Sequence, residues 1–212
     1  MTPSPNDAEA RAKITFGLDE LQALKSHAFH GRPCAARASA GLAIRLLTGL
    51  AGDAPAVLNE IDCLEGVRES RNTKPASQFR HAPLHPLWHK HYLATRHILP
   101  NIGIRWGVNA QGNRDFDRMI RDVARAHGEN PDQWPGIIAH RFAHDGYVDR
   151  SHAGRLTGDW IIFAEHGGTK YYLDLAMHEE GLPENASRLL AKLQGSAGAE
   201  FPFAFETGSI TT

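Results

Sequence analysis

Hydrophobic residues recur every three or four positions in several segments before residue 150, a spacing that predicts amphipathic helices. The segment Gly31-Arg32-Pro33 ends the first of them, and Pro55 lies in the expected first turn of the third, where proline is favourable. Residues 66–86 are rich in proline and are expected to form an irregular basic loop. We expect helices over residues 18–29, 35–50, 55–64, 87–99, 115–127 and 135–144.

The period of the pattern changes toward the C-terminus. Two runs rich in β-forming residues, 160–164 and 171–175, are separated by Gly167-Gly168, which predicts a β-hairpin. A helix over 184–193 follows, and residues 201–205 are expected to form an edge strand because they contain a proline. The sequence therefore predicts an α+β fold, with a helical N-terminal half packed with a small antiparallel sheet in the C-terminal part.

The chain of 212 residues is long enough for one sizeable core. We expect a flexible arm over residues 1–13 and a single domain over 14–212. Its helical lobe is placed at about 14–144, and its hairpin, sheet and last helix at about 155–206. Two cysteines make no disulfide framework, and the N-terminus shows no secretory signal. These features predict a cytoplasmic protein that does not enter a membrane.

Charge is unevenly distributed. The net charge of −1 argues against a protein that coats DNA in general. However, residues 68–97 contain six Lys and Arg against one Glu, and five histidines lie between residues 81 and 97. Cations interleaved with Trp88 and Tyr92 are typical of single-stranded nucleic-acid binders, although a solvated basic face has the same composition. The candidate substrate-binding residues are Arg80, His81, His89, Lys90, His91 and Arg96.

The predicted hairpin suggests a catalytic surface. A two-residue turn pairs Phe163 with Tyr172 and Ile161 with Asp174, and alternation then gathers polar residues on one face. A base, an acid and a cation are what phosphodiester cleavage without a metal requires. The alternative is an exposed sheet face with a cross-strand ion pair. The candidate catalytic residues are Glu165, Lys170, Tyr172, Asp174 and His178.

The histidines also allow a metal site. A helix over 87–99 separates His89 from His91, which argues against a local His-x-His pair. His140 and His144 are one helical turn apart, as in zinc proteases, but Arg141 stands where those enzymes have Glu. The preferred interpretation uses neither a metal nor a cofactor, and a histidine-rich metal-binding protein or metalloenzyme remains an alternative.

The helix-rich N-terminus followed by the hairpin resembles small bacterial ribonuclease toxins of the RelE and barnase type, over about fifty residues. The stretch Arg121-Asp122-Val123-Ala124-Arg125-Ala126-His127 also resembles the Arg/His motif of HEPN ribonucleases, which would place Arg121 and His127 on RNA. HEPN domains are all-helical, so the predicted hairpin departs from that family. Both resemblances imply RNA cleavage.

The sequence thus leads to a hypothesis of a metal-independent phosphodiesterase or ribonuclease of bacterial toxin type. Its expected partners are RNA, or another phosphate-bearing ligand, and a cognate inhibitor protein. A non-catalytic module that binds an anionic partner is a further alternative, in which the histidines make the contact dependent on pH.

Overall fold

The computed structural model describes residues 15–49, 53–69, 73–108, 114–153, 156 and 158–206, and the expected arm over 1–13 lies outside these ranges. The fold class is α+β, as predicted. The helices are α1 (Leu18–Ala28), α2 (Ala40–Thr48), α3 (Ala54–Leu64), α4 (Ile98–Trp106), α5 (Arg114–Ala126), α6 (Trp134–His140), α7 (Gly146–His152) and α8 (Ala186–Ala197). The strands are β1 (Ser77–Gln78), β2 (Trp88–Tyr92), β3 (Asp159–His166) and β4 (Thr169–Ala176).

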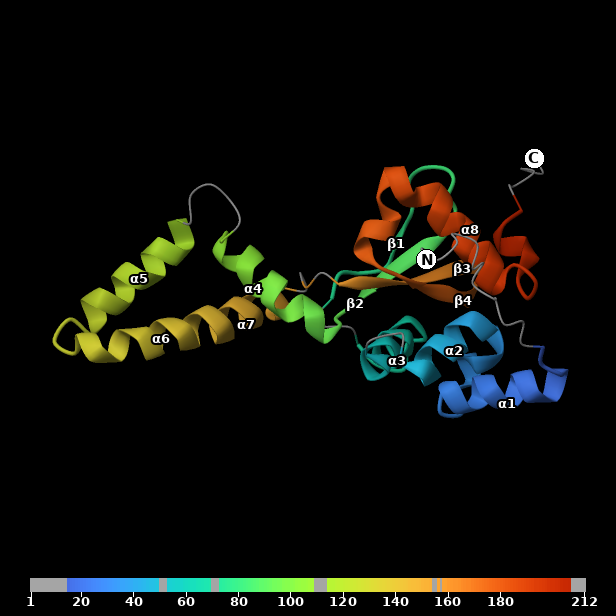
Figure 1. The fold of residues 1–212 in the computed structure, drawn as a ribbon, viewed down its shortest axis with the longest axis horizontal. Helices are drawn as coiled ribbons and strands as arrows, with labels where there is room; N and C mark the ends of the chain where they lie inside the picture. Colours follow the sequence, from blue (N-terminus) through green and yellow to red (C-terminus); the bar gives the residue numbers. More distant parts are fainter. Residues whose placement is uncertain are drawn as a thin grey trace, which may run out of the picture.

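The four strands form one antiparallel sheet in the order β1-β2-β3-β4, and helices cover both of its faces (Figure 1). Side chains such as Phe163 and Tyr172 pack with Leu42 and Ile61 of α2 and α3 on one face. On the other face Leu173 and its neighbours pack with α8. Successive strand residues point to opposite faces of the sheet. Because helices cover both faces, both sets of alternating positions in the strands are apolar.

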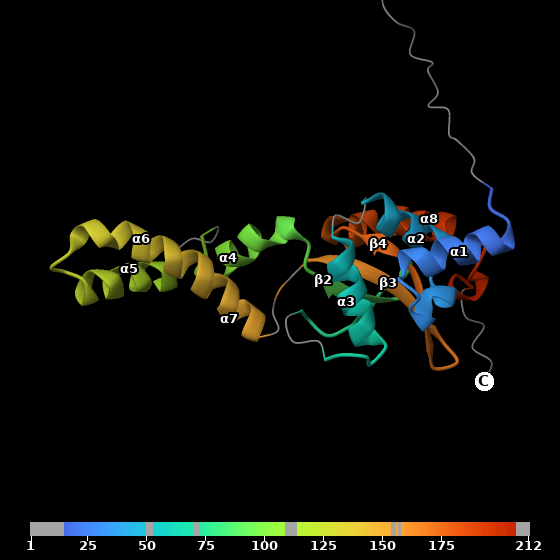
Figure 2. The same cartoon turned by 90° about the horizontal axis from the view of Figure 1, so that it is seen from below.

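Helices α4 to α7 form a separate cluster that extends away from the sheet (Figures 1 and 2). Its core contains Ile102, Trp106, Met119 and Val123. The indole N–H of Trp106 donates to the carbonyl of Phe142 over 2.8 Å, in the π-helical turn Arg141–Asp145 between α6 and α7. In the described ranges, no helix combines the length and the apolar composition that crossing a bilayer needs.

The hairpin forms with the predicted two-residue turn. Gly167 and Gly168 have φ of 56° and 73°, as a type I′ turn requires. The predicted pairing of Phe163 with Tyr172 is confirmed, but a register shift between Ile162 and Phe163 changes the pairs beyond it. Asp174 is therefore opposite Ile162 and not, as predicted, opposite Ile161.

The helix predicted over 87–99 is wrong. Residues 88–92 form strand β2, which pairs with β3, and helix α4 begins only at Ile98 and includes Pro100. Alternation explains the result, because Lys90 and Tyr92 are buried on one face while His89 and His91 share the other with Trp160. The predicted loop over 66–86 also contains the short strand β1.

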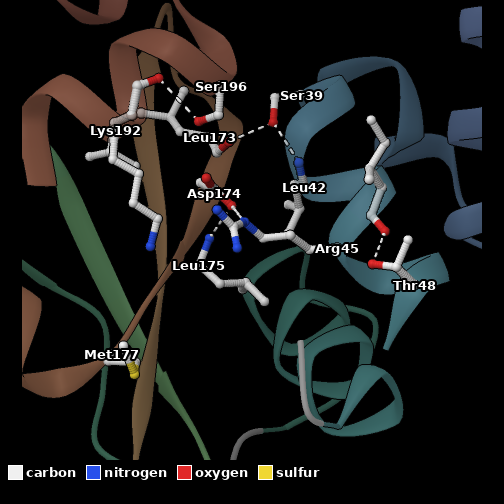
Figure 3. Close-up of polar contacts among 12 residues, drawn as sticks. Ser39, Leu42, Arg45, Thr48, Leu173, Asp174, Leu175, Met177, Lys192 and Ser196 are labelled. Atoms are coloured by element: carbon white, nitrogen blue, oxygen red, sulfur yellow. Dashed lines mark hydrogen bonds and ion pairs between the residues drawn. The ribbon is translucent and has the colours of Figure 1, made fainter. Parts of the chain in front are cut away.

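Two other predictions need correction. The terminal strand expected over 201–205 is a 3-10 turn, Pro202–Ala204, in which Phe203 packs beside Tyr171 together with the preceding Phe201. The helix expected over 35–50 is divided, because Ser39 caps α2 and starts a new helix. Its hydroxyl accepts from the Leu42 N–H over 3.0 Å and donates to the Leu173 carbonyl, which ties α2 to β4 (Figure 3).

The accessible polar face predicted for the hairpin does not form. Helices α2 and α3 and the 3-10 turn Pro33–Arg37 cover it, and Tyr172 and Asp174 are both 0 % exposed. The alternation of residues along the two strands was interpreted as one buried and one exposed face. Ile161, Phe163 and Leu175 make the face that was expected to be exposed apolar as well.

Candidate active site

Three histidines converge around Trp160 at one end of the sheet. His89 and His91 come from β2, and His178 follows β4 as the first residue of a 3-10 turn. Their ring centroids lie 4.5, 5.9 and 5.0 Å, respectively, from that of Trp160. The rings of His91 and His178 are 6.0 Å apart. We call these three residues the histidine centre.

Glycine allows Trp160 to occupy this position. A Cβ atom at Gly181 would lie 1.6 Å from the Trp160 ring, and one at Gly158 would lie 1.9 Å from the carbonyl oxygen of Tyr92. A larger residue at Gly181 would therefore displace the indole ring against which the histidines pack.

His91 is held as a neutral imidazole. Trp160 donates its indole N–H to Nδ1 over 3.2 Å, and the Gly158 N–H points to the same atom at 3.4 Å. Because an indole can only donate, Nδ1 accepts, and the ring proton lies on Nε2. If Nδ1 were protonated, it would lose the hydrogen bonds from Trp160 and Gly158 N–H. It would instead donate to the Gly158 carbonyl, which is 3.1 Å away. Burial lowers the pKa of His91 to about 4.

His89 is packed between aromatic rings. Its centroid lies 4.7 Å from that of Phe79, and its Nε2 is 3.2 Å from the Ser77 hydroxyl. Its Nδ1 is buried without a hydrogen-bond partner among the described residues. Burial, followed by the charge of His178, lowers the pKa of His89 to about 4. His178 is the exposed member of the histidine centre, and the imidazole rings of His89 and His91 beside it are neutral.

A second group lies at the same end of the sheet as the histidine centre. Asp159, which is 2 % exposed, precedes Trp160 and forms an ion pair with Arg96. Its Oδ1 is 3.1 Å from Nε2 of His97, and that nitrogen is 3.4 Å from Nε of Arg96. Burial and the neighbouring Arg96 lower the pKa of His97, and His178 adds to the effect. We call Arg96, His97 and Asp159 the Asp159 group.

A polar pocket of about 120 Å³ adjoins the Asp159 group. Arg45 and Lys192 enter it from α2 and α8, on opposite faces of the sheet (Figure 3). Arg45 Nε lies 2.6 Å from Asp174, and Lys192 Nζ lies 2.8 Å from Glu180. With Arg96, three cations therefore line the pocket, each paired with a carboxylate.

Most of the predicted catalytic residues are apart from this site. The Tyr172 hydroxyl donates to Glu65 over 2.5 Å, and burial raises the pKa of that phenol far above its usual range. Asp174 is paired with Arg45 in the interior. Glu165 and Lys170 face each other near the hairpin turn, at the far end of β3 and β4 from His178. Of the five, only His178 lies in the histidine centre.

The predicted substrate-binding residues also separate. His89 and His91 belong to the histidine centre, and Arg96 to the Asp159 group. Lys90 is buried on the opposite face, where its Nζ bonds to Thr73 over 2.6 Å. Arg80 and His81 are exposed in the connection between β1 and β2.

The metal alternative gains no geometric support. Among the residues that the structure describes, no group of three His, Cys, Asp or Glu is placed to hold a metal ion. His140 and His144 stack on each other with centroids 5.1 Å apart on the exposed surface of the helical cluster. The predicted metal-free site stays a prediction.

Sequence reasoning missed Trp160, His97 and Asp159 as members of the site. Trp160 is buried in the sheet and lies in the run 160–164 that was predicted as a strand, and the helix predicted over 87–99 concealed that its face of the sheet also carries His89 and His91. A strand over 88–92 paired with β3 would have placed them together. Comparison with known proteins identified no relative, since no protein-family model, curated protein or solved structure matches the chain.

Proposed function

We propose that this protein is a metal-independent phosphodiesterase that cleaves RNA by acid–base catalysis, with His178 of the histidine centre and His97 of the Asp159 group as the two catalytic imidazoles. The observation that carries the proposal is that both imidazoles lie at the start of β3: the ring of His178, at the end of the hairpin, packs 5.0 Å from that of Trp160, and Nε2 of His97, from the basic segment, lies 3.1 Å from Asp159. Two separate sequence features thus contribute to one site. The Asp159 group also contributes an arginine, Arg96.

The roles follow from the exposure and the contacts of the two imidazoles. His97, whose pKa is lowered by burial, is the base: its Nε2 faces Asp159, so Nδ1 accepts the proton of a ribose 2′-hydroxyl. The resulting imidazolium is stabilised by Asp159, 3.1 Å from Nε2. The 2′-oxygen then bonds to phosphorus as the bond to the 5′-oxygen breaks. His178 is exposed, and it donates the proton that the departing 5′-oxygen takes up.

Arg96 supplies the positive charge. Its side chain is 52 % exposed while it pairs with the buried Asp159, and its Nε lies 3.4 Å from Nε2 of His97, so it reaches both solvent and the proposed base. A guanidinium in that position stabilises the negative charge that accumulates on the phosphate oxygens during the reaction.

Product analysis tests this mechanism. The purified chain is incubated with a short RNA in excess chelator, and the new ends are identified by mass spectrometry. We expect a 2′,3′-cyclic phosphate on one product and a 5′-hydroxyl on the other. If the chain binds the RNA under these conditions but does not cleave it, the result would instead favour a non-catalytic module that binds an anionic partner.

A further inference from the structure

Helix α5 carries four arginines, Arg114, Arg118, Arg121 and Arg125, at intervals of four, three and four residues. At 3.6 residues per turn, this spacing places all four within an arc of about 60° on one face. The face opposite points into the helical cluster, where Met119 and Val123 are buried. The arginines therefore form a straight line directed at solvent, which we call the arginine stripe.

All four side chains of the stripe are available to a ligand. Arg118 and Arg125 are 67 % and 80 % exposed, and each pairs with an aspartate three residues earlier, at 3.2 and 3.7 Å. Exposed pairs of this kind contribute little and exchange easily. In the described part of the chain, neither Arg114 nor Arg121 forms an ion pair.

We infer that the arginine stripe is a docking surface for the phosphate backbone of a nucleic acid. The backbone positions of successive arginines lie about 5 Å apart along the helix axis, and the stripe spans about 16 Å. An evenly spaced line of planar donors suits a linear polyanion whose phosphates follow one another at short intervals. Arginine binds such phosphates through two parallel hydrogen bonds.

A membrane surface does not suit this helix. An amphipathic helix that lies on a bilayer inserts its apolar face among the lipids. On α5 that face is already covered, because Met119 and Val123 pack against Trp106 and the other residues of the cluster. A folded acidic protein is a weaker candidate than a nucleic acid, because a nucleic acid carries a phosphate at every nucleotide whereas regularly spaced carboxylates need a particular sequence on the partner.

The stripe is remote from the histidine centre. Helix α5 lies in the part of the molecule farthest from the sheet (Figure 1). The inference rests on the proposed cleavage of RNA. A long RNA substrate would contact α5 with a part of its backbone that lies away from the phosphate being cleaved. Binding itself is measured without cleavage, so the two proposals fail separately.

The test is the salt dependence of binding to a fluorescent, single-stranded 2′-O-methyl RNA, which lacks the nucleophile. Each phosphate contact contributes about 0.7 to the slope of log K against log salt concentration for a single strand. Replacing the four arginines by Gln should therefore reduce the slope by about 3 and weaken binding at least tenfold. Replacing them by Lys should retain the slope, because the charges remain.

Two further variants complete the test. Asp117→Asn on the same helix should tighten binding, and Arg188→Gln on the exposed side of α8 should leave the slope unchanged within about 0.7. The inference is overturned if the four-Gln variant changes the slope no more than Arg188→Gln does. It is also overturned if wild type prefers anionic vesicles or an acidic peptide to the RNA. Should the four-Gln variant misfold, single Arg→Gln variants that leave the slope unaltered would overturn it equally.

Discussion

Arg45 of α2 and Asp174 of β4 form an ion pair, with 2.6 Å between Nε and Oδ1, and the carboxylate is completely buried (Figure 3). Oδ1 also accepts the N–H of Leu175 over 2.8 Å. Asp174 therefore binds α2 to the middle of the hairpin and serves the structure of the sheet.

Removing Arg45 should destabilise the fold, because a buried carboxylate that loses its partner costs several kcal/mol. Since the Arg45 side chain is 31 % exposed, water reaches part of the site, and we expect Arg45→Ala to lower the free energy of unfolding by about 2 kcal/mol. Denaturant unfolding measures this change. The control is Arg125→Ala, whose exposed pair should contribute less than about 1 kcal/mol. Equal effects of the two changes would contradict the role of Asp174.

The buried His91 should make stability depend on pH. Its pKa is about 4 in the folded protein and about 6.5 when the chain is unfolded, so the unfolded state binds the proton first. The stabilisation is complete above pH 6.5 and is lost as the pH falls through 4. The full effect is of the order of 3 kcal/mol. Thermal or denaturant unfolding between pH 7 and 4 measures it.

The variant His91→Gln isolates this contribution. A glutamine carbonyl can accept the N–H of Trp160 without titrating, so the variant should lose less stability than wild type between pH 7 and 4. His166→Gln, at an exposed position near the hairpin turn, should follow the wild-type curve. Identical curves for wild type and His91→Gln would show that His91 titrates as an exposed histidine does.

A methyl group at Gly181 should disturb the site. The added Cβ meets the Trp160 ring at 1.6 Å, and overpacking of this kind costs about 1–3 kcal/mol. We expect Gly181→Ala to unfold more easily and to show altered tryptophan fluorescence. Gly195→Ala on α8, where the added Cβ meets nothing within 4 Å, should instead be neutral or stabilising by up to about 1 kcal/mol. A stable Gly181→Ala protein with unchanged fluorescence would disprove this packing.

Tyr172 distinguishes the observed site from the one predicted on the hairpin. Tyr172→Phe removes the hydroxyl that bonds to Glu65, which keeps Arg37 as a partner, so we expect a loss of about 1 kcal/mol. RNA cleavage should continue at the wild-type rate. A loss of cleavage in a folded Tyr172→Phe protein would restore the hairpin residue as a catalytic group.

Local signals explain why most helices and the hairpin were predictable. Pro55 and the Gly167-Gly168 pair act through backbone conformation alone, and both have the predicted effect. Strand β2 was not predictable in this way. Residues 88–92 have apolar and long polar side chains that suit either a helix or a strand, and pairing with β3 decides between them.

The candidate site was predictable only in part for the same reason. His91 and His178 were each identified as candidates, but the sequence did not show that they meet, because this depends on the long-range pairing of β2 with β3. The burial of Tyr172 and Asp174 depends on α2 and α3, which the hairpin sequence does not reveal.

Cleavage of RNA by a His178→Ala variant is the most direct test of the account. Wild type, His178→Ala and the exposed control His166→Ala are assayed with the same RNA in excess chelator, after their folding is verified. Removal of a catalytic acid or base lowers the rate by about 10²–10⁴. We predict a loss in that range for His178→Ala and none for His166→Ala, whereas full activity of His178→Ala would contradict catalysis by the histidine centre.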